Sequence, residues 1–361
     1  MTGSRERGTV RSDLPQRGQG VGVERVPLAV IIATKNRSDA IERYAFASLE
    51  RSVFRDFVCV VWDASDDERT RAVAESAGWS FPLRYFKAPR AGLTSQRNDA
   101  AGYVLKHIPS VRYVLFIDDD SELSCEALEG VLRSFEDDLV WGVNVPQVPL
   151  MEKREGDRKG EGRGRLSRAA LRSRVVTSYL HNKGACPEAH GIGAQWLSGC
   201  GMAFRREVFE ELGLCFPEAF QRFGGYALGE DVALSFYLHK KKGKRLVNAV
   251  SGTLRHHASG GARLNVANMA ASKWYNFHLL FECLYDDVRG PGLLWLKVKF
   301  KLFMLAAALK LLIRARSVDA ASLFRGIGFA RAALREFHAE RRIETLFFRV
   351  QQKQDKNKIK R

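Results

Sequence analysis

The chain has 361 residues, an apolar content of 45% and an aromatic content of 10%, which suit a folded protein with one large body and extensions. Its net charge of +17 is unevenly distributed: residues 291–361 carry 17 Lys and Arg against 5 Asp and Glu, which leaves about +5 for the first 290 residues. Such a basic tail suggests a nucleic-acid partner or an anionic membrane surface. The nearly balanced body and the lack of a recognised nucleic-acid module argue against the first.

The first segment, MTGSRERGTVRSDLPQRGQGVG, contains no apolar run and is therefore not a secretory signal peptide. We predict a disordered leader over residues 1–26. The six cysteines are widely spaced and form no Cys-x-x-Cys pair. This spacing favours reduced, buried thiols in a cytosolic protein over a disulfide framework or a zinc site.

From Pro27 onward, short apolar runs alternate with longer mixed segments. The runs that predict strands are LAVIIAT (28–34), FVCVVWD (57–63), LRYFKA (83–88) and RYVLFID (112–118). Continuous apolar strands of this length are typical of a parallel sheet that is buried on both faces. The segments that predict helices are 38–52, 66–78 and 93–107, with Ser38 and Asp66 as N-caps. The alternation predicts an α/β doubly wound sheet with helices on both faces, in which ligands bind beyond the carboxyl ends of the strands.

Three further segments follow the predicted sheet strands. Residues 151–165, MEKREGDRKGEGRGR, are charged and glycine-rich, which predicts a mobile loop. A helix is predicted near 166–180. Another is predicted from about Gly229 to Lys242, ended by Gly243 and with lysines in its last turn, where the helix dipole favours cations.

The stretch YVLFIDDDSELS (113–124) places three adjacent carboxylates after an apolar strand, although each like-charged neighbour raises the cost of ionising the next. If the strand continues through this run, Asp118 and Asp120 point to one face and Asp119 to the other. Two carboxylates on one side fit Mg²⁺ or Mn²⁺, whose remaining ligands are phosphate oxygens and water. The alternative is helix capping or a solvated turn.

An ordered set of short motifs extends over residues 27–260. They are VIIATKNR, VVWDASDD, GLTSQRNDA, FIDDDSE, LSGCGMAFRREVF, LGEDVALSFYLHKKKGK and RHH. In this order they resemble a family 2 glycosyltransferase of the GT-A fold. The resemblance implies a Rossmann-like nucleotide-binding sheet and an inverting, metal-dependent transfer of a sugar from a nucleotide-diphosphate donor, with UDP favoured over GDP and dTDP.

The resemblance also implies roles for single residues. The donor-binding residues it implies are Thr34, Asn36, Arg37, Asp63, Arg97, Asn98 and Asp118. The metal ligands it implies are Asp118, Asp120 and His256, with His257 as the alternative to His256, and the acceptor-side residues are Trp196, Ser198 and Gly199. For Asp63, which ends a strand beside Ser65, an Asx-turn is an equal alternative.

Asp231 matches the catalytic base of the family, and Glu230 is expected to orient it or to contact the acceptor. Inverting transfer by single displacement needs a carboxylate that takes the proton of the attacking acceptor hydroxyl. A bound cation stabilises charge on the departing diphosphate. Acids in the first turn of a helix are also favoured by the helix dipole, which is the purely structural alternative for this pair.

Residues 293–313 are apolar except for Lys297, Lys299, Lys301 and Lys310. A lysine at the centre of a membrane-spanning helix costs roughly 2.5–3.5 kcal/mol, so we favour attachment at the membrane interface over a packed soluble helix or a span. The lysines do not gather on one face of a helical wheel, so a simple amphipathic helix is not predicted. We predict a helical, membrane-associating region over 261–350 and a basic tail over 351–361.

These expectations together describe a cytoplasmic transferase that is peripheral at the inner face of the cell membrane. Its acceptor would be a saccharide or a lipid-linked acceptor in cell-surface polysaccharide or glycolipid synthesis. Two alternatives remain open from the sequence: a catalytically inactive GT-A-fold scaffold at the membrane, and a polyprenyl-phosphate glycosyltransferase.

Overall fold

The computed structural model describes residues 26–76, 78–149, 174–178, 180, 189–224, 227–257, 266–314 and 320–349, without the side chains of 311–314 and 320. The predicted leader, the predicted loop over 151–165, most of the helix predicted near 166–180 and the predicted tail over 351–361 lie outside these residues.

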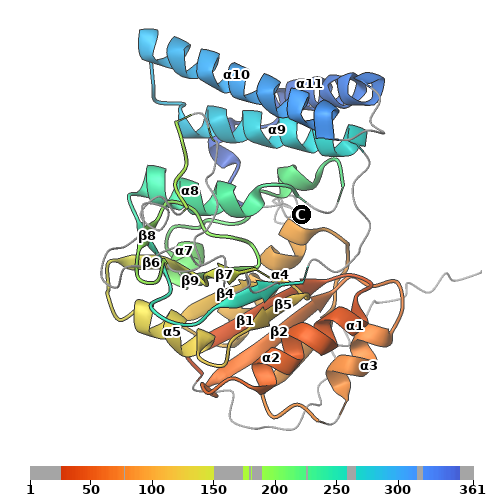
Figure 1. The fold of residues 1–361 in the computed structure, drawn as a ribbon, viewed down its shortest axis with the longest axis vertical. Helices are drawn as coiled ribbons and strands as arrows, with labels where there is room; N and C mark the ends of the chain where they lie inside the picture. Colours follow the sequence, from red (N-terminus) through yellow and green to blue (C-terminus); the bar gives the residue numbers. More distant parts are fainter. Residues whose placement is uncertain are drawn as a thin grey trace, which may run out of the picture.

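A mixed eight-stranded sheet forms the centre of the molecule, in the order β3-β2-β1-β4-β9-β6-β10-β8 (Figure 1). Its first four strands in the chain are parallel and agree with the predicted runs to within a residue: β1 (Leu28–Thr34), β2 (Phe57–Asp63), β3 (Leu83–Lys87) and β4 (Tyr113–Ile117). The other strands are β6 (Val140–Asn144), β8 (Gly193–Ala194), β9 (Gly201–Arg205) and β10 (Arg245–Asn248). Because β9 is antiparallel to both β4 and β6, the sheet is mixed and not wholly parallel.

Helices cover both faces of the sheet, as predicted. One face packs on α1 (Ser38–Ala40), the π-helical η2 (Ile41–Phe46), α2 (Ala47–Glu50), α3 (Arg69–Glu75) and α5 (Ala127–Ser134). The other face packs on α4 (Leu93–His107), α7 (Glu207–Glu210) and α8 (Glu230–Lys242), with η4 (Glu218–Gln221) nearby. Consecutive residues of β1 point to opposite faces of the sheet, as the two-residue period of a strand requires. Val30 belongs to the hydrophobic core on the side of α2 and α5, and Ile31 belongs to the core on the side of α4 and α8.

Both N-cap predictions are wrong. Ser38 lies inside the first helix, with Arg37 at the cap position, and α3 begins at Arg69 after Glu68. Asp66 is used elsewhere, because its carboxylate accepts a hydrogen bond from the Asn36 side chain at 2.7 Å.

A small second sheet holds two distant segments together beside β4. It contains β5 (Ser121–Leu123), β11 (Leu254–His256) and β7 (Gln147–Val148). In the antiparallel pair of β5 and β11, His256 lies opposite Ser121, directly after the acidic run. This pairing carries a histidine to the aspartates.

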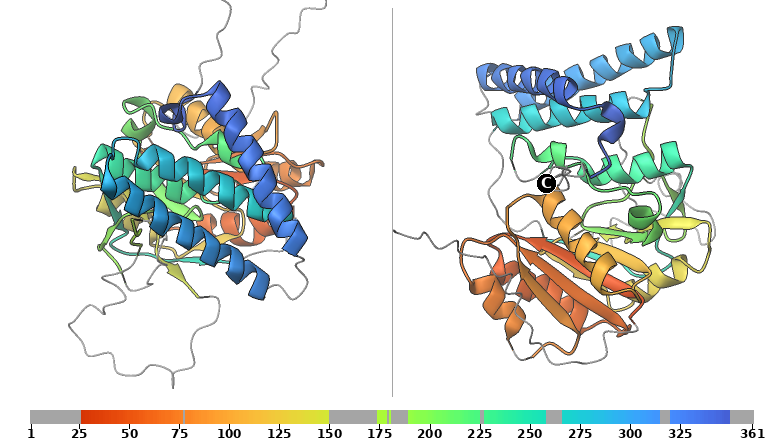
Figure 2. Two further views of the ribbon diagram at one scale, coloured as in Figure 1. Left: turned by 90° about the horizontal axis from the view of Figure 1, so that it is seen from above. Right: turned by 180° about the vertical axis from the view of Figure 1, so that it is seen from behind.

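Three long helices form a layer at the end of the molecule away from the sheet (Figures 1 and 2). They are α9 (Val266–Leu284), α10 (Pro291–Arg314) and α11 (Ala320–Glu340), followed by the short η5 (Ile343–Thr345). The Asn276 amide of α9 donates to the Leu228 carbonyl at 2.8 Å, and Phe300 of α10 stacks on Phe281 of α9 at 4.4 Å between ring centroids. Among the helices that the structure describes, none combines the length and the apolar character that a membrane crossing needs.

Five cysteines lie in the described part of the chain, and all five are free. Cys59, Cys200, Cys215 and Cys283 are buried, whereas Cys125 is exposed. Burial raises the pKa of each of the four buried thiols. For these four residues the predicted burial is confirmed, whereas the exposed Cys125 departs from it.

We expect Gly252→Ala to destabilise the protein more than Gly243→Ala. Both glycines have a left-handed φ, of +80° and +64°, so alanine costs about 1–2 kcal/mol at either position. At Gly252 an added Cβ would also lie 2.3 Å from the Cα of Ala127, whereas at Gly243 nothing lies within 4 Å. The clash adds about 1–3 kcal/mol to the loss in unfolding free energy. Urea denaturation of both variants measures the difference, and equal losses would contradict the close packing of Gly252 on α5.

Candidate active site

Asp118, Asp120 and His256 form a compact group at the carboxyl end of β4. One ligand atom from each residue lies within 4.8 Å of the others. His256 Nε2 is 2.9 Å from Asp120 Oδ1 and 3.6 Å from Asp118 Oδ2. The predicted pairing of the two aspartates is present, but its stated reason is wrong, because β4 ends at Ile117 and a turn, not a continued strand, carries the acids.

The group suits a divalent cation. Carboxylate oxygens and an imidazole nitrogen are donors that such ions accept, and three donors this close can share one ion. The helix-capping alternative is not what the structure shows: α5 starts after Glu126 and has no side-chain cap. The hydrogen bond to Asp120 raises the pKa of His256, so cation and proton compete for this imidazole.

His256, and not His257, belongs to this group. His257 Nε2 lies 2.8 Å from a carboxylate oxygen of Glu122, and its ring stacks on Tyr44 with 3.8 Å between centroids. His257 directly follows β11, and consecutive residues of an extended chain point to opposite sides, which separates the two imidazoles. Of the two histidines, the geometry favours His256, and its role as a metal ligand stays a prediction.

Asp119 contacts Thr34 and Arg37, two contacts that the sequence did not predict. It accepts hydrogen bonds from the Thr34 hydroxyl at 2.7 Å and from Arg37 at 3.1 Å, and Arg37 also donates to Asp120 at 2.9 Å. Burial raises the pKa of Asp119 to about 7, against the opposing effect of Arg37. The loop after β1 therefore supplies part of the positive charge that the acidic run needs.

Arg97 connects the metal group to the start of α8. Its guanidinium is buried and donates to Asp118 at 2.9 Å, to Glu230 at 2.7 Å and to the carbonyl of Gly199 at 2.9 Å. Charge-assisted bonds of this kind are about twice as strong as neutral ones. Thus Arg97 positions two acidic side chains and the turn at Gly199 at once.

Asn98 does not join this group. Its amide donates to the carbonyl of Phe216 at 2.9 Å and accepts from the Phe216 N–H at 2.8 Å. Both ends of the amide are thus used to hold a neighbouring loop. The structure thus shows a structural role for Asn98, and its contact with the donor stays a prediction.

Asp231 is held in place by two backbone N–H groups. Gly199 donates to its Oδ2 at 2.9 Å and Val232 donates to its Oδ1 at 2.7 Å. Burial raises the pKa values of both Asp231 and Glu230, with Arg97 opposing the shift. A carboxylate with a raised pKa is a stronger base for proton transfer.

The predicted acceptor-side segment lies next to Asp231. Ser198 donates its backbone N–H to the Asn144 side chain at 2.9 Å, and Trp196 is buried. An added Cβ at Gly199 would lie 3.2–3.3 Å from the Arg97 guanidinium and from Glu230, so a side chain here would crowd both. The segment therefore serves first to position the acids of α8.

Asp63 is fully buried and occupied within the protein. Its carboxylate accepts hydrogen bonds from the Ser65 N–H at 2.8 Å and from the Tyr85 hydroxyl at 2.7 Å. It also accepts a hydrogen bond from the Ser65 hydroxyl. The bond to the Ser65 N–H is the Asx-turn contact that was the alternative for this residue. Its role in reading a nucleotide base stays a prediction.

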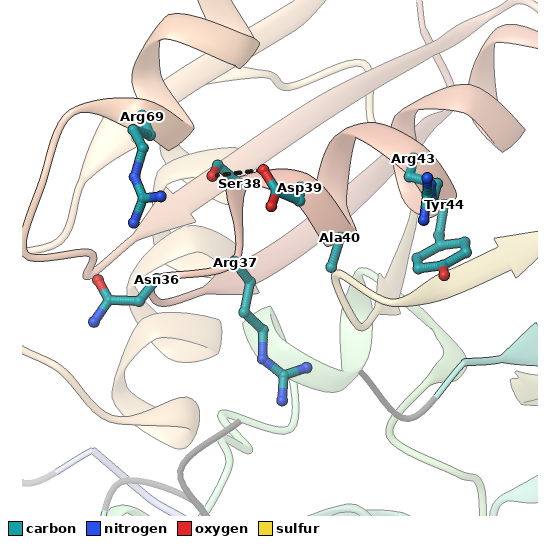
Figure 3. A pocket seen from close by; sticks show the side chains of 8 residues that line it. All are labelled: Asn36, Arg37, Ser38, Asp39, Ala40, Arg43, Tyr44 and Arg69. Carbon is teal, nitrogen blue, oxygen red and sulfur yellow. Dashed lines mark hydrogen bonds between the residues drawn. The ribbon is translucent and has the colours of Figure 1, made fainter. Parts of the chain in front are cut away.

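A cavity of about 280 Å³ opens beside the loop that follows β1 (Figure 3). Three of its lining residues are arginines, Arg37, Arg43 and Arg69, and Asn36 lies at its edge. Figure 3 shows that the three guanidinium groups do not converge on one point. The cavity is therefore an approach to Arg37 and not a site for a single anion.

Comparison with known proteins identifies the family. The description "Glycosyl transferase family 2" matches residues 29–213, more than half of the chain. This chain belongs to glycosyl transferase family 2. The resemblance drawn from the motifs is confirmed. Asp231 and His256 lie beyond the matched residues, so their roles depend on the geometry of the site.

Two solved structures are similar to this transferase. A mannosyltransferase from Pyrobaculum calidifontis, solved with GDP-Man and Mn²⁺, is 18% identical with a TM-score of 0.48, over 88% of this chain and 76% of that one. A fragment of S. aureus TarS, solved with UDP-GlcNAc, is 16% identical with a TM-score of 0.51, over 85% of this chain and 81% of that one. The second likeness confirms the predicted fold. No curated protein matches the chain by sequence.

Family and site together define the activity at a coarse level. The protein is a glycosyltransferase that uses a nucleotide-sugar donor, and it has a three-residue group suited to a divalent cation.

Proposed function

We propose that the protein is an inverting transferase that moves a sugar from a UDP-sugar to a hydroxyl of a saccharide or lipid-linked acceptor at an anionic membrane surface. The connection through Arg97 is the observation that carries the proposal. Arg97 bonds Asp118 of the metal group, and through the turn at Gly199 it is linked to Asp231. The proposed sites of leaving-group stabilisation and of proton removal thus share one hydrogen-bonded network, which supports the proposal.

In this mechanism Asp231 takes the proton of the acceptor hydroxyl as that oxygen attacks the anomeric carbon. The two N–H groups that hold Asp231 fix its orientation, and Glu230, paired with Arg97, keeps the start of α8 in place. Asp118, Asp120 and His256 would hold a divalent cation, which would supply charge stabilisation for the leaving diphosphate. Attack on the face opposite the leaving group inverts the anomeric centre.

On the donor side we propose contacts from the loop that follows β1 and from Asp118. Thr34 and Arg37 bond the acidic run directly, and Asn36 holds a left-handed φ of 56° at the turn of that loop. TarS, which shares the fold, was solved with UDP-GlcNAc, and we take uridine diphosphate as the first donor to test.

Calorimetric titration with UDP, GDP and dTDP, each with and without Mn²⁺, tests the donor proposal. We expect one nucleotide, UDP, to bind in a metal-dependent way. A folded protein that binds none of the three would contradict the donor site, and stronger binding of GDP or dTDP would replace the proposed nucleotide.

For the membrane contact we propose the outer face of α10. The exposed large apolar residues of this helix are Leu294, Trp295, Val298, Leu302, Leu305 and Leu309, with exposed fractions between 39% and 66%. They recur every three or four residues and so form one stripe, roughly 22 Å long at the rise of an α-helix. The opposite side of the helix, which includes Phe300 and Met304, is buried. This helix is therefore apolar on two opposite faces, one packed and one exposed.

The four lysines border the exposed stripe. At about 100° per residue, Lys297 and Lys301 lie along one edge of the stripe and Lys299 and Lys310 along the other. Lys299 also lies 5.0 Å from the ring centre of Trp295. The lysines do not gather on one face of the helix because they flank the apolar stripe on both sides. Such an arrangement suits a helix lying in the interface of an anionic membrane.

The double variant Leu302→Glu, Leu305→Glu is expected to lose binding to vesicles that contain anionic lipid, by about tenfold or more, because two charges would enter the apolar stripe. The matched control is Val53→Glu, Leu139→Glu, which places the same charges at exposed apolar residues outside the stripe. Vesicle sedimentation measures both. Equal binding by the two double variants would show that α10 is not the docking face.

The domain division belongs to the same proposal. We propose residues 27–260 as the transferase body and 261–350 as the membrane-docking layer, with α9 packed into the core of the body. Of the alternatives, an inactive scaffold is disfavoured by the connected metal group, Arg97 and Asp231, which a purely structural protein does not need.

A further inference from the structure

The side chain of Arg174 is a buried charge that has no hydrogen-bond partner among the described residues. Its side chain is fully covered, and all three guanidinium nitrogens lack an acceptor in the part of the chain that the structure describes. Burial lowers the pKa of Arg174 to about 10. Buried charges in proteins are nearly always paired, so an unpartnered guanidinium indicates that an anion is missing from its surroundings.

The backbone holds Arg174 in this position despite strain. Arg174 has a left-handed φ of 52°, a conformation that L-residues other than glycine seldom adopt. Its carbonyl accepts the N–H of Gln195 at 3.0 Å, and the Gln195 side chain accepts the N–H of Val176 at 2.8 Å. The guanidinium stacks on Trp196, with 4.6 Å between its carbon and the ring centre. A strained, clamped and stacked arginine is typical of a functional position.

The location is next to the proposed base. Trp196 begins the short segment that ends at Gly199, whose N–H holds Asp231. Arg174 is close enough to Asp231 to interact with its charge. By contrast, the two arginines that lie beside the metal group, Arg37 and Arg97, are each paired with carboxylates. The unpartnered guanidinium therefore lies near the proposed base and stacks on Trp196, a residue that the sequence assigned to the acceptor side.

We propose that Arg174, stacked on Trp196, binds an anionic group of the acceptor, a phosphate or a carboxylate. This inference rests on the proposed function, and it narrows the acceptor from any saccharide or lipid-linked hydroxyl to one that carries negative charge close to the attacking oxygen. A guanidinium fork matches both anions, because each offers two oxygens to parallel N–H groups.

The test uses the full chain saturated with UDP and Mg²⁺, so that added anions cannot occupy the donor site. Binding of inorganic phosphate, glucuronate and glucose is measured by calorimetry, with glucose as the neutral match for glucuronate. The variants are Arg174→Met, Arg174→Lys and the control Arg84→Met, an arginine on β3 that bonds the Tyr103 hydroxyl away from the site. The Tm of each free protein is recorded.

We expect phosphate, glucuronate or both to bind the wild type and Arg84→Met at least tenfold more tightly than Arg174→Met, with Arg174→Lys in between. Which anion binds distinguishes a phosphate-bearing from a carboxylate-bearing acceptor. We also expect Arg174→Met to raise the Tm of the free protein, because it removes an unpartnered buried charge. Equal anion binding by the wild type and Arg174→Met, binding of neither anion, or a lower Tm for Arg174→Met would overturn the inference. Failure of the wild type to bind UDP would instead overturn the donor proposal, so the experiment distinguishes failure of the donor proposal from failure of the inference about Arg174.

Discussion

Asp231→Asn is expected to lower kcat by about 10²–10⁴-fold, because an amide cannot take the proton of the acceptor hydroxyl. UDP release from the UDP-sugar measures the rate, with water as the acceptor where no better one is known. Affinity for UDP with Mn²⁺ should stay within about twofold, since the Asp231 carboxylate bonds the N–H groups of Gly199 and Val232 and does not belong to the metal group. Activity within tenfold of the wild type would rule out Asp231 as the base.

The pH dependence of the wild type gives an independent check on the same residue. Burial raises the pKa of Asp231, and only the deprotonated form accepts a proton, so kcat should fall as the pH drops through a value above the ordinary aspartate range. The control variant is Asp137→Asn, an aspartate that pairs with Arg245 at the surface. It should keep both the rate and the pH profile of the wild type.

Asp120→Ala is expected to abolish the metal-dependent part of UDP affinity, a loss of about 100-fold or more when Mn²⁺ is present. Asp120 is buried, faces His256 at 2.9 Å and is one of only three side chains in the group. Without it the cation keeps two protein ligands, of which Asp118 is also paired with Arg97. Calorimetry with Mn²⁺ alone and then with UDP separates loss of the ion from loss of the nucleotide.

The adjacent histidines provide a matched pair for the same experiment. His256→Ala should weaken Mn²⁺ binding, whereas His257→Ala should leave it unchanged, because His257 pairs with Glu122 and stacks on Tyr44. The two variants remove the same side chain from neighbouring positions of the chain. If His257→Ala weakened the ion as much as His256→Ala, the metal group assigned by the structure would be wrong.

Local signals in the sequence were enough to predict several parts of this protein. The strands at 28–34 and 57–63 are continuous apolar runs, and the helix at 93–107 is a single mixed segment, so each was predicted to the residue. The order of the short motifs was enough to predict the family that the comparison then confirmed. The residue types of the metal group and of the proposed base were also predicted, since carboxylates at strand and helix ends are visible in the chain.

Tertiary packing was needed to establish which of these groups meet. The three-residue strands β5 and β11 are too short for a periodic signal, yet their pairing selects His256 over His257 and brings it to Asp120. Arg97 is bonded to two carboxylates, Asp118 and Glu230, that come from other parts of the chain, and Asn98 is bonded to the backbone of Phe216.

Two further features, the lysines of α10 and the burial of Arg174, could not be predicted from the sequence, because burial is a property of the folded chain. The lysines of α10 became interpretable only when packing showed which face of the helix is covered. Arg174 lies in a segment with no distinctive pattern, and the proposal for it rests on its burial against Trp196 without a side-chain partner among the described residues. Local sequence predicts elements and residue types, whereas desolvation and long-range pairing, which set the chemistry of the site, arise only when distant segments pack together.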